Sequence, residues 1–356
     1  MKQLMKGNHA LAEAAIRAGC RFFAGYPITP QSEILEYFSW RMPEAGGSFA
    51  QTSSEIEGIN QVLGAAAAGQ RAITSSSGPG FTLKQEGISY MQSLEVPAVI
   101  VDVMRYGIGL GDIFYGQGDY FQATKGGGHG GYLLPVYAPS SVQENADLVA
   151  LAFDTAEKYR SPVIVLSDAA IGQMCGSVEL PEMKEFDIDR FEWALKGRDR
   201  HYPQGRTLTD RMYYDFGYDE YDKHERDRYD AMKENEQLWE EVQAEDAEVI
   251  LVSYGISSRI CKEAVKAARA EGLRLGLIRA ITVWPFPTKA FQKYNGKASA
   301  YMTVEMSQMG QMAEDAFIAA HCQTPVYSMP TGRDVADSED IIANVKDILA
   351  GRKEAF

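Results

Sequence analysis

The chain has 356 residues, of which 45% are apolar and 24% charged, and its formal net charge is −14. This length is sufficient for two compact domains, each with its own core. The negative charge argues against binding to nucleic acid or to anionic membranes. No apolar run is long enough to span a bilayer, and the first residues, MKQLMKGNHALAEAA, begin a helical pattern rather than a secretory leader.

The four cysteines are scattered along the chain at Cys20, Cys175, Cys261 and Cys322, with no C-x-x-C pair. This spacing does not form the usual zinc or iron–sulfur sites, so no metal site is expected on this chain. We therefore expect reduced, mostly buried thiols and a cytoplasmic protein.

Helical and strand patterns alternate from residue 7 to about residue 168. Helical periodicity is found at 8–19, 54–69 and 144–159, and short apolar runs are found at 22–26, 71–76, 98–103 and 162–168. Runs of this kind are typical of strands that are buried on both faces. The first part of the chain, residues 1–185, is therefore predicted to be an α/β domain with a parallel sheet covered by helices.

Residues 186–245 differ in composition from the segments before and after them, because they are charged and tyrosine-rich with few aliphatic side chains. The end of this stretch is compatible with a solvated helix. The segment is interpreted either as a linker or insertion, or as an arm that contacts another subunit, since tyrosines are frequent at interfaces.

The alternation restarts near residue 248 and defines a second, smaller α/β domain at 246–356. Strand patterns are found at 248–255, 274–280, 298–306 and 325–329, and helical patterns at 258–272, from about 311, and at 338–351. Gly272 directly follows a helical run, as expected of a helix C-terminal turn.

The stretch GYPITPQSE, residues 25–33, joins the first predicted strand to a helix. Pro27 and Pro30 favour extended geometry at Tyr26 and Thr29. Pro30 also suits a first helical position, which predicts Thr29 as the N-cap. The corner is then either a plain capped turn or a rigid ligand site at the carboxyl end of a parallel strand.

Two glutamates begin the next helical pattern. Glu55 lies on the same face as Ile59 and Val62, whereas Glu57 lies on the polar face. A carboxylate at the start of a buried stripe is costly unless it is paired or protonated. Glu55 is either such a group or a first-turn residue that complements the helix dipole.

Two further strands end in candidate ligand loops. The first ends in TSSSGPG, where Ser76 and Gly78 allow a ligand close to the backbone, although no Walker lysine follows. Arg105 directly follows the second strand and opens a long glycine-rich loop that contains His129. Loops of this length are usually functional or disordered. A cation at Arg105 is placed to hold a carboxylate, while His129 is either a ligand contact or a polar loop residue.

Together these pieces resemble the alpha subunit of the 2-oxoacid:ferredoxin oxidoreductases over essentially the whole chain. The matching segments are GYPITPQSE, SSEIEGIN, TSSSGPGFTLKQEG, DVMRYG, QGDYFQATKGGGHG, SYGISSRICKEAVKAARAEGLRLGLIRAITVWPFP and VEMSQMGQM. Within the family the branched-chain (3-methyl-2-oxobutanoate) type is most similar. The resemblance implies a pyrimidine-binding thiamine diphosphate domain followed by a domain like the C-terminal domain of transketolase.

The resemblance also implies roles for single residues. The family's glutamate that bonds the aminopyrimidine ring of the coenzyme falls on Glu55, and Ser76 and Gly78 are expected to line the cofactor. The threonine and arginine that face the 2-oxoacid carboxylate fall on Thr29 and Arg105, and Tyr26 is expected beside them. The reaction would convert a 2-oxoacid and coenzyme A to acyl-CoA, CO2 and reduced ferredoxin.

The chain lacks the Gly-Asp-Gly motif with a downstream Asn that holds Mg²⁺ and the diphosphate in thiamine enzymes. The resemblance therefore implies a beta subunit that carries this half of the site, together with gamma and ferredoxin-like delta subunits that bear [4Fe-4S] clusters. The chain departs from the family pattern at Tyr106, at Gly131-Tyr132 and in the tyrosine-rich segment 200–230. Alternatives left open are the same chemistry on 2-oxoglutarate or pyruvate, a non-oxidative transketolase-like subunit, and a non-catalytic scaffold subunit.

Overall fold

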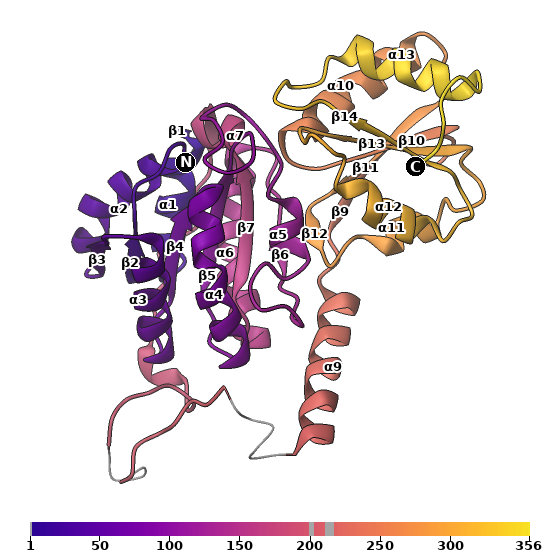
Figure 1. The fold of residues 1–356 in the computed structure, drawn as a ribbon. Helices are drawn as coiled ribbons and strands as arrows, with labels where there is room; N and C mark the ends of the chain where they lie inside the picture. The colour runs from indigo at the N-terminus through magenta and orange to yellow at the C-terminus, as the bar shows by residue number, and fades with distance from the viewer. Residues whose placement is uncertain (1, 199–202, 211–216) are drawn as a thin grey trace.

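The structure is a computed structural model that describes residues 2–198, 203–210 and 217–356. Figure 1 shows two α/β units side by side, with the long helix α9 rising to the second. The first unit contains β1 (Gln3–Lys6), α1 (Gly7–Arg17), β2 (Phe22–Gly25), α2 (Ser32–Glu44), β3 (Ser48–Gln51), α3 (Glu55–Ala67), β4 (Ala72–Ser76), α4 (Pro79–Ser93), β5 (Val99–Met104), α5 (Tyr120–Thr124), β6 (Val136–Tyr137), α6 (Val142–Tyr159), β7 (Val163–Asp168), α7 (Ala169–Gln173) and β8 (Cys175–Val178).

A short 3-10 helix, η1 (Ile188–Arg190), precedes the second group of elements. That group contains α9 (Tyr218–Asn235), β9 (Trp239–Val242), β10 (Val249–Ser253), α10 (Gly255–Ala270), β11 (Leu275–Ala280), β12 (Thr282–Trp284), α11 (Thr288–Gln292), β13 (Ala300–Glu305), α12 (Met312–Ala320), β14 (Val326–Pro330) and α13 (Ser338–Leu349).

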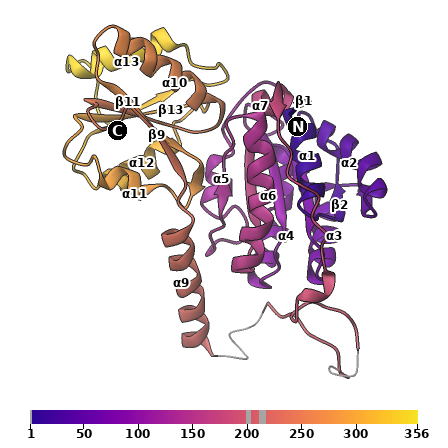
Figure 2. The ribbon, with the colours of Figure 1, turned by 180° about the vertical axis from the view of Figure 1, so that it is seen from behind.

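The first sheet has the strand order β12-β6-β7-β5-β4-β2-β3 and is parallel except for the β12–β6 pair. Helices α3 and α4 cover the face seen in Figure 1, and α1 and α6 cover the face seen in Figure 2. Side chains of β5 alternate between the two cores: Val101 and Val103 pack on one side and Ile100 on the other. This confirms the predicted α/β fold with strands buried on both faces.

The second sheet has the order β14-β13-β10-β11-β9, and only β9 runs antiparallel. Helices α10 and α13 pack on one face, and α11 and α12 on the other. Gly272 has φ 84° just after α10, as its position in the sequence predicted.

The segment 186–245 contributes to both units. Helix α9 is mostly exposed, in agreement with the predicted solvated helix, and buries Arg228 and Met232. Strand β9 lies within the segment but pairs with β11 in the second sheet. Part of the tyrosine-rich stretch 200–230 lies outside the described residues.

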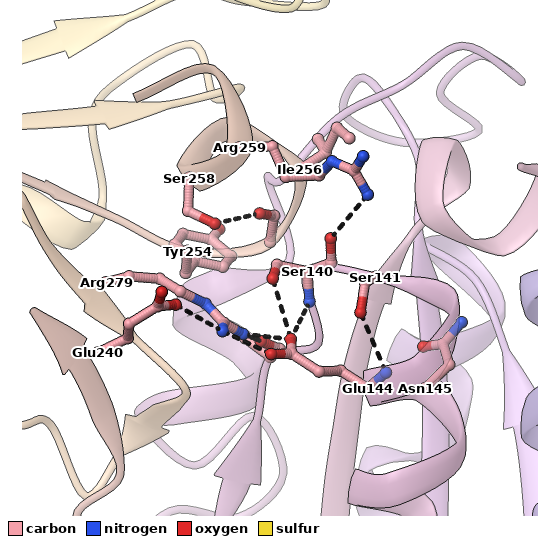
Figure 3. Close-up of polar contacts among 12 residues, drawn as sticks. Ser140, Ser141, Glu144, Asn145, Glu240, Tyr254, Ile256, Ser258, Arg259 and Arg279 are labelled. Carbon is pink, nitrogen blue, oxygen red and sulfur yellow. Dashed lines mark hydrogen bonds and ion pairs between the residues drawn. The ribbon is translucent and has the colours of Figure 1, made fainter. Parts of the chain in front are cut away.

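An ion pair between a buried arginine and a partly exposed glutamate joins the two units (Figure 3). Arg279 on β11 donates to both oxygens of Glu144 on α6, with Nη1 2.6 Å from Oε1. The Ser140 amide and hydroxyl also donate to Glu144, at 2.7 and 2.9 Å. Burial raises the pKa of Glu144, but the hydrogen bonds and charge of Arg279 outweigh it and leave the pKa lowered.

Gln117, from the loop before α5, forms a second link between the units. Its amide donates to the Met306 carbonyl at 2.6 Å, and its side-chain oxygen accepts from Ser257 Oγ at 2.7 Å and from the Met306 amide at 2.8 Å. Its side-chain nitrogen donates to the Tyr254 carbonyl at 3.1 Å. The glycine-rich loop is thereby anchored to the second unit. Among the helices of the described residues, none is both long and apolar enough to cross a membrane.

Candidate active site

The corner between β2 and α2 differs from the predicted capped turn. Helix α2 begins at Ser32, its N-cap is Gln31, and no side chain caps it. A turn closed by the Gln31 amide and the Ile28 carbonyl, 2.9 Å apart, comes between strand and helix. The prediction of Thr29 as N-cap, with Pro30 as first helical residue, is therefore wrong.

Two buried amide side chains brace this corner instead. Gln31 donates from Nε2 to the Tyr26 carbonyl at 2.9 Å and accepts from Ser75 Oγ at 2.6 Å. Asn8, on α1, donates to the Pro30 carbonyl at 3.0 Å. Fully buried amides with several partners fix the backbone around them, because breaking one bond leaves a polar group unsatisfied. Tyr26 and Thr29 are left exposed on this braced backbone.

Arg105 lies against this corner, at the end of β5. Its Nη1 donates to the Thr29 carbonyl at 2.8 Å, and its Nη2 donates to the Leu110 carbonyl within its own loop. The side chain is 7% exposed, and its Nε has no partner in the described structure. The structure thus brings Thr29 and Arg105 together at the carboxyl edge of the sheet, as the sequence predicted.

Glu55 is the first residue of α3 and is 6% exposed, whereas Glu57 is exposed and bonds back to the Ser53 amide at 2.7 Å. The predicted contrast between the two glutamates is therefore confirmed. The Glu55 carboxylate points at Gly80 and Ser76, since a Cβ at Gly80 would overlap Glu55 Oε1 and Ser76 Oγ. No hydrogen bond to this carboxylate is found among the described residues.

Polar atoms without partners gather around this carboxylate and Arg105. They are buried in the described structure and comprise Ser76 Oγ, Ser77 Oγ and Arg105 Nε. Native structures leave few such atoms unsatisfied, so their concentration in one place indicates a polar site with donors and acceptors suited to a ligand. Gly78 lies at its edge with φ 48°, a conformation that favours glycine.

Asp102 and Asp119 are a pair of acids that the sequence reasoning missed. Burial and then the charge of Asp119 raise the pKa of Asp102 well above its usual range. Burial raises the pKa of Asp119 to about 6, although its hydrogen bond from Gln122, 2.7 Å long, opposes this. At neutral pH the two groups therefore hold one proton between them, and the positive charge of Arg105 faces the remaining negative charge.

The residues present fit the pyrimidine half of thiamine diphosphate. In the part of the chain that the structure describes, the Glu55 carboxylate has no donor and the Ser76 hydroxyl has no partner, so they offer the acceptor and the donor that the edge of an aminopyrimidine ring requires. The diphosphate and its metal do not have a matching motif in this chain.

Other candidate groups lie apart from this site. His129 is exposed and lines a groove of about 640 Å³ with residues of α4, including Gln85 and Tyr90. Glu95, His224 and Glu225 have metal-ligand spacing, but Arg160 and Arg228 already supply positive charge to Glu95.

The cysteines are free, as expected, but they are not mostly buried. Cys20 and Cys261 are buried, whereas Cys175 and Cys322 are exposed. Cys175 is the first residue of β8, and Cys322 lies just after α12.

Family profiles and relatives agree on one family. The profile described as pyruvate flavodoxin/ferredoxin oxidoreductase, thiamine diphosphate-binding, matches residues 13–244, and that of pyruvate:ferredoxin oxidoreductase core domain II matches residues 247–339. Ketoisovalerate oxidoreductase subunit VorB of Methanothermobacter marburgensis is 45% identical over 97% of this chain and 97% of its own length. 2-Oxoglutarate synthase subunit KorA of Methanocaldococcus jannaschii is 38% identical over 86% of this chain and 89% of its own.

Solved structures share the fold at lower identity. The 2-oxoglutarate:ferredoxin oxidoreductase of Magnetococcus marinus superposes with a TM-score of 0.83 at 24% identity over 97% of this chain, which spans 65% of that chain's length. A split-gene transketolase covers 98% of this chain and 100% of its own, with a TM-score of 0.61 at 14% identity. With matching profiles over both units and relatives of 38–45% identity along most of its length, this chain belongs to the 2-oxoacid:ferredoxin oxidoreductases, as a subunit that carries their thiamine diphosphate-binding domain.

Proposed function

We propose that this chain is the alpha subunit of a 2-oxoacid:ferredoxin oxidoreductase that acts on branched-chain 2-oxoacids such as 3-methyl-2-oxobutanoate. The reaction consumes the 2-oxoacid and coenzyme A and yields acyl-CoA, CO2 and reduced ferredoxin. The observation that carries the proposal is the buried Glu55, whose carboxylate accepts no hydrogen bond from the described residues and lies beside the Ser76 hydroxyl, which is also without a partner among them.

Bound thiamine diphosphate would supply the carbon nucleophile and the electron sink that decarboxylation needs. Glu55 holds a proton at the pyrimidine edge, and burial strengthens that hydrogen bond relative to water. Ser76 and Gly78 line the ring, where the small residues permit close approach.

Arg105 orients the 2-oxoacid carboxylate. Its guanidinium is already fixed by the carbonyls of Thr29 and Leu110, so little side-chain freedom is lost when a carboxylate binds. The exposed hydroxyls of Thr29 and Tyr26 stand on the same braced corner and complete the carboxylate contacts.

The loop after Arg105 favours an aliphatic acyl group. Its tip exposes Ile108, Leu110 and Ile113, at 87%, 80% and 60%. Between Arg105 and Lys125 the sequence has no basic residue, and Lys125 already pairs with Asp315. A second carboxylate, as in 2-oxoglutarate, would find no cation in this loop. The 45% identity to a ketoisovalerate subunit, against 38% to a 2-oxoglutarate subunit, supports the same choice.

The site is completed by partner chains. We infer a beta subunit that binds Mg²⁺ and the diphosphate, and gamma and ferredoxin-like delta subunits whose [4Fe-4S] clusters pass electrons to ferredoxin. The absence of a Gly-Asp-Gly motif in this sequence supports the first inference, and the subunit names of the relatives support a multi-subunit enzyme. Reduced thiols at four unpaired cysteines support a cytoplasmic location.

A substrate panel on the complex purified with its natural partners tests the proposal. We expect reduction of a low-potential acceptor with 3-methyl-2-oxobutanoate, coenzyme A and thiamine diphosphate, and a lower kcat/KM with 2-oxoglutarate and pyruvate. Glu55→Gln should lower turnover by at least ~100-fold, whereas the exposed control Glu57→Gln should leave it unchanged. Preference for 2-oxoglutarate would reassign the substrate. Turnover without the iron–sulfur partner would indicate a transketolase-like enzyme, and absence of thiamine binding a scaffold subunit.

A further inference from the structure

Lys84 is a fully buried lysine, on α4, that the proposed chemistry does not use. Its side chain crosses from α4 to α3 and β4. Its Nζ donates to Thr74 Oγ1 at 2.9 Å and lies 3.4 Å from the backbone carbonyl of Glu55. The Thr74 hydroxyl in turn donates to the Ala24 carbonyl on β2 at 2.7 Å, so a chain of hydrogen bonds links Lys84 to β2. Within the described residues, Lys84 has no carboxylate close enough for an ion pair.

The Lys84 Nζ is closely packed against α3. A Cβ at Gly58, on α3, would lie 3.3 Å from Lys84 Nζ and 3.2 Å from the Gly25 Cα. A glycine at this position of the helix therefore leaves the space that the amine fills. The surroundings come from α3, β4 and β2, and the charged group that acts on Lys84 is Glu55.

We propose that Lys84 is a positioning residue of the active site, which clamps the first turn of α3 to β4 and sets a positive charge behind Glu55. The proposal deepens the function proposed above and rests on it for the catalytic meaning of Glu55. The clamp holds the backbone from which the Glu55 carboxylate projects, and the charge of that carboxylate acts on the Lys84 amine.

A purely structural role fits the observations poorly. An ammonium without an ion pair is among the most costly groups to bury, and an apolar side chain of similar length would fill the same space. Burial lowers the pKa of Lys84 to about 7, and the Glu55 charge raises it against that trend. The protonation of Lys84 is therefore linked to the charge on Glu55.

The linkage can be measured on the full chain without coenzyme or partners. In lysine-selective ¹³C NMR titrations, we expect one lysine with a midpoint near 7 in the wild type, and its loss in Lys84→Met. Glu55→Gln should move this midpoint to lower pH, because it removes the charge that favours the ammonium. Glu57→Gln, which alters an exposed neighbour on the same turn, should not. A midpoint that is unmoved in Glu55→Gln would overturn the proposal.

The catalytic consequence is measured on the purified complex. Lys84→Met and Lys84→Gln should lower kcat on the order of 100-fold, the loss expected for a group misplaced by about 1 Å, with little change in the KM of the 2-oxoacid. The step that the titration of Lys84 contributes near pH 7 should be missing from the pH profile in both variants. Gln92→Met is the matched control, because Gln92 is another buried polar residue of α4 and bonds Ser161 and Tyr229 instead.

The outcomes separate the two proposals. Wild-type kcat and an unmoved pH profile in Lys84→Met would refute the role of Lys84 even if the complex is active. A complex that lacks 2-oxoacid activity while the NMR midpoint still responds to Glu55→Gln would refute the proposed function and retain the coupling.

Discussion

Lys84→Met should stabilise the folded chain although it impairs the site. Holding an ammonium in the core costs free energy that a methionine of similar length avoids, and the pKa of Lys84 measures this cost. The pKa falls from 10.5 to about 7 because of burial, with the Glu55 charge opposing. At about 1.4 kcal/mol per pKa unit, the unfavourable term at pH 7 is roughly 4 kcal/mol.

Part of the stability gained by removing the buried ammonium is lost again in Lys84→Met. Methionine loses the hydrogen bonds to Thr74 Oγ1 and to the Glu55 carbonyl, worth about 1 kcal/mol each. The net expectation for Lys84→Met is a free energy of unfolding about 2 kcal/mol above that of the wild type at pH 7.

The pH dependence of the free energy of unfolding gives an independent test of whether the buried Lys84 charge destabilises the fold. The pKa of Lys84 is lower in the folded than in the unfolded chain, so between pH 7 and 10.5 the unfolded chain binds more protons. Wild-type stability should therefore rise with pH across this window through the Lys84 term, and Lys84→Met should lack that rise. The wild type and Lys84→Met are unfolded in urea at pH 6, 8 and 9.5. Their urea midpoints are compared where the dependence of the unfolding free energy on urea concentration is the same.

The control and the refuting result follow from the same reasoning. Gln92→Met, which removes hydrogen bonds of an uncharged side chain on the same helix, should destabilise the chain by about 1–3 kcal/mol. If Lys84→Met is destabilised to the same extent as Gln92→Met, or keeps the wild-type dependence on pH, Lys84 does not carry a buried charge and the reasoning fails.

Two further predictions concern the link between the units and the substrate contacts. Glu144→Gln removes the carboxylate nearest to the buried Arg279 and leaves Glu240 at 3.4 Å, so it should lower the free energy of unfolding in a thermal or urea experiment by about 1–3 kcal/mol. Because the pKa of Glu144 is lowered in the fold, the wild type should also lose stability as the pH falls below about 4.5. Thr29→Val and Arg105→Ala should mainly raise the KM for the 2-oxoacid in steady-state assays of the complex, and an unchanged KM would remove these residues from carboxylate binding.

Alternation of helix and strand was predictable because each buried element repeats its pattern within a few residues. The contrast between Glu55 and Glu57 followed from the same helical spacing, since Ile59 and Val62 continue the stripe on which Glu55 lies. Local patterns of this kind depend little on which elements pack against them. They can therefore be predicted from the sequence alone.

Features set by distant residues were not predictable in this way. The expected Thr29 cap fails because Asn8 and Gln31, from other parts of the fold, hold the corner in a turn before the helix. The link made by Gln117 joins residues about 140 and 190 positions away, which no local pattern records. Substrate preference was also open in the sequence, since it depends on which loop side chains end up exposed.

Lys84 was within reach of the sequence but was not identified. On a helix, Phe81, Lys84, Ile88 and Met91 share one face, and the structure buries all four. The test that singled out Glu55, an ionisable residue on an apolar stripe, applies to Lys84 without change. Two ionisable residues on the apolar faces of neighbouring helices therefore indicate a functional site more strongly than either residue alone.

The position of these two charges argues for function over stability. Glu55 and Lys84 come from adjacent helices, α3 and α4, whose contact is otherwise built from residues such as Ile59 and Gly87 in close apposition. An apolar pair in their place would pack at lower cost, so the fold gains no stability from these charges. What they provide is a buried carboxylate on a helix turn whose backbone carbonyl lies 3.4 Å from the Lys84 amine, which also bonds Thr74 on β4. Such an arrangement suits a group that must hold a proton at one atom of a bound ring, and it accounts for both the cost and the placement.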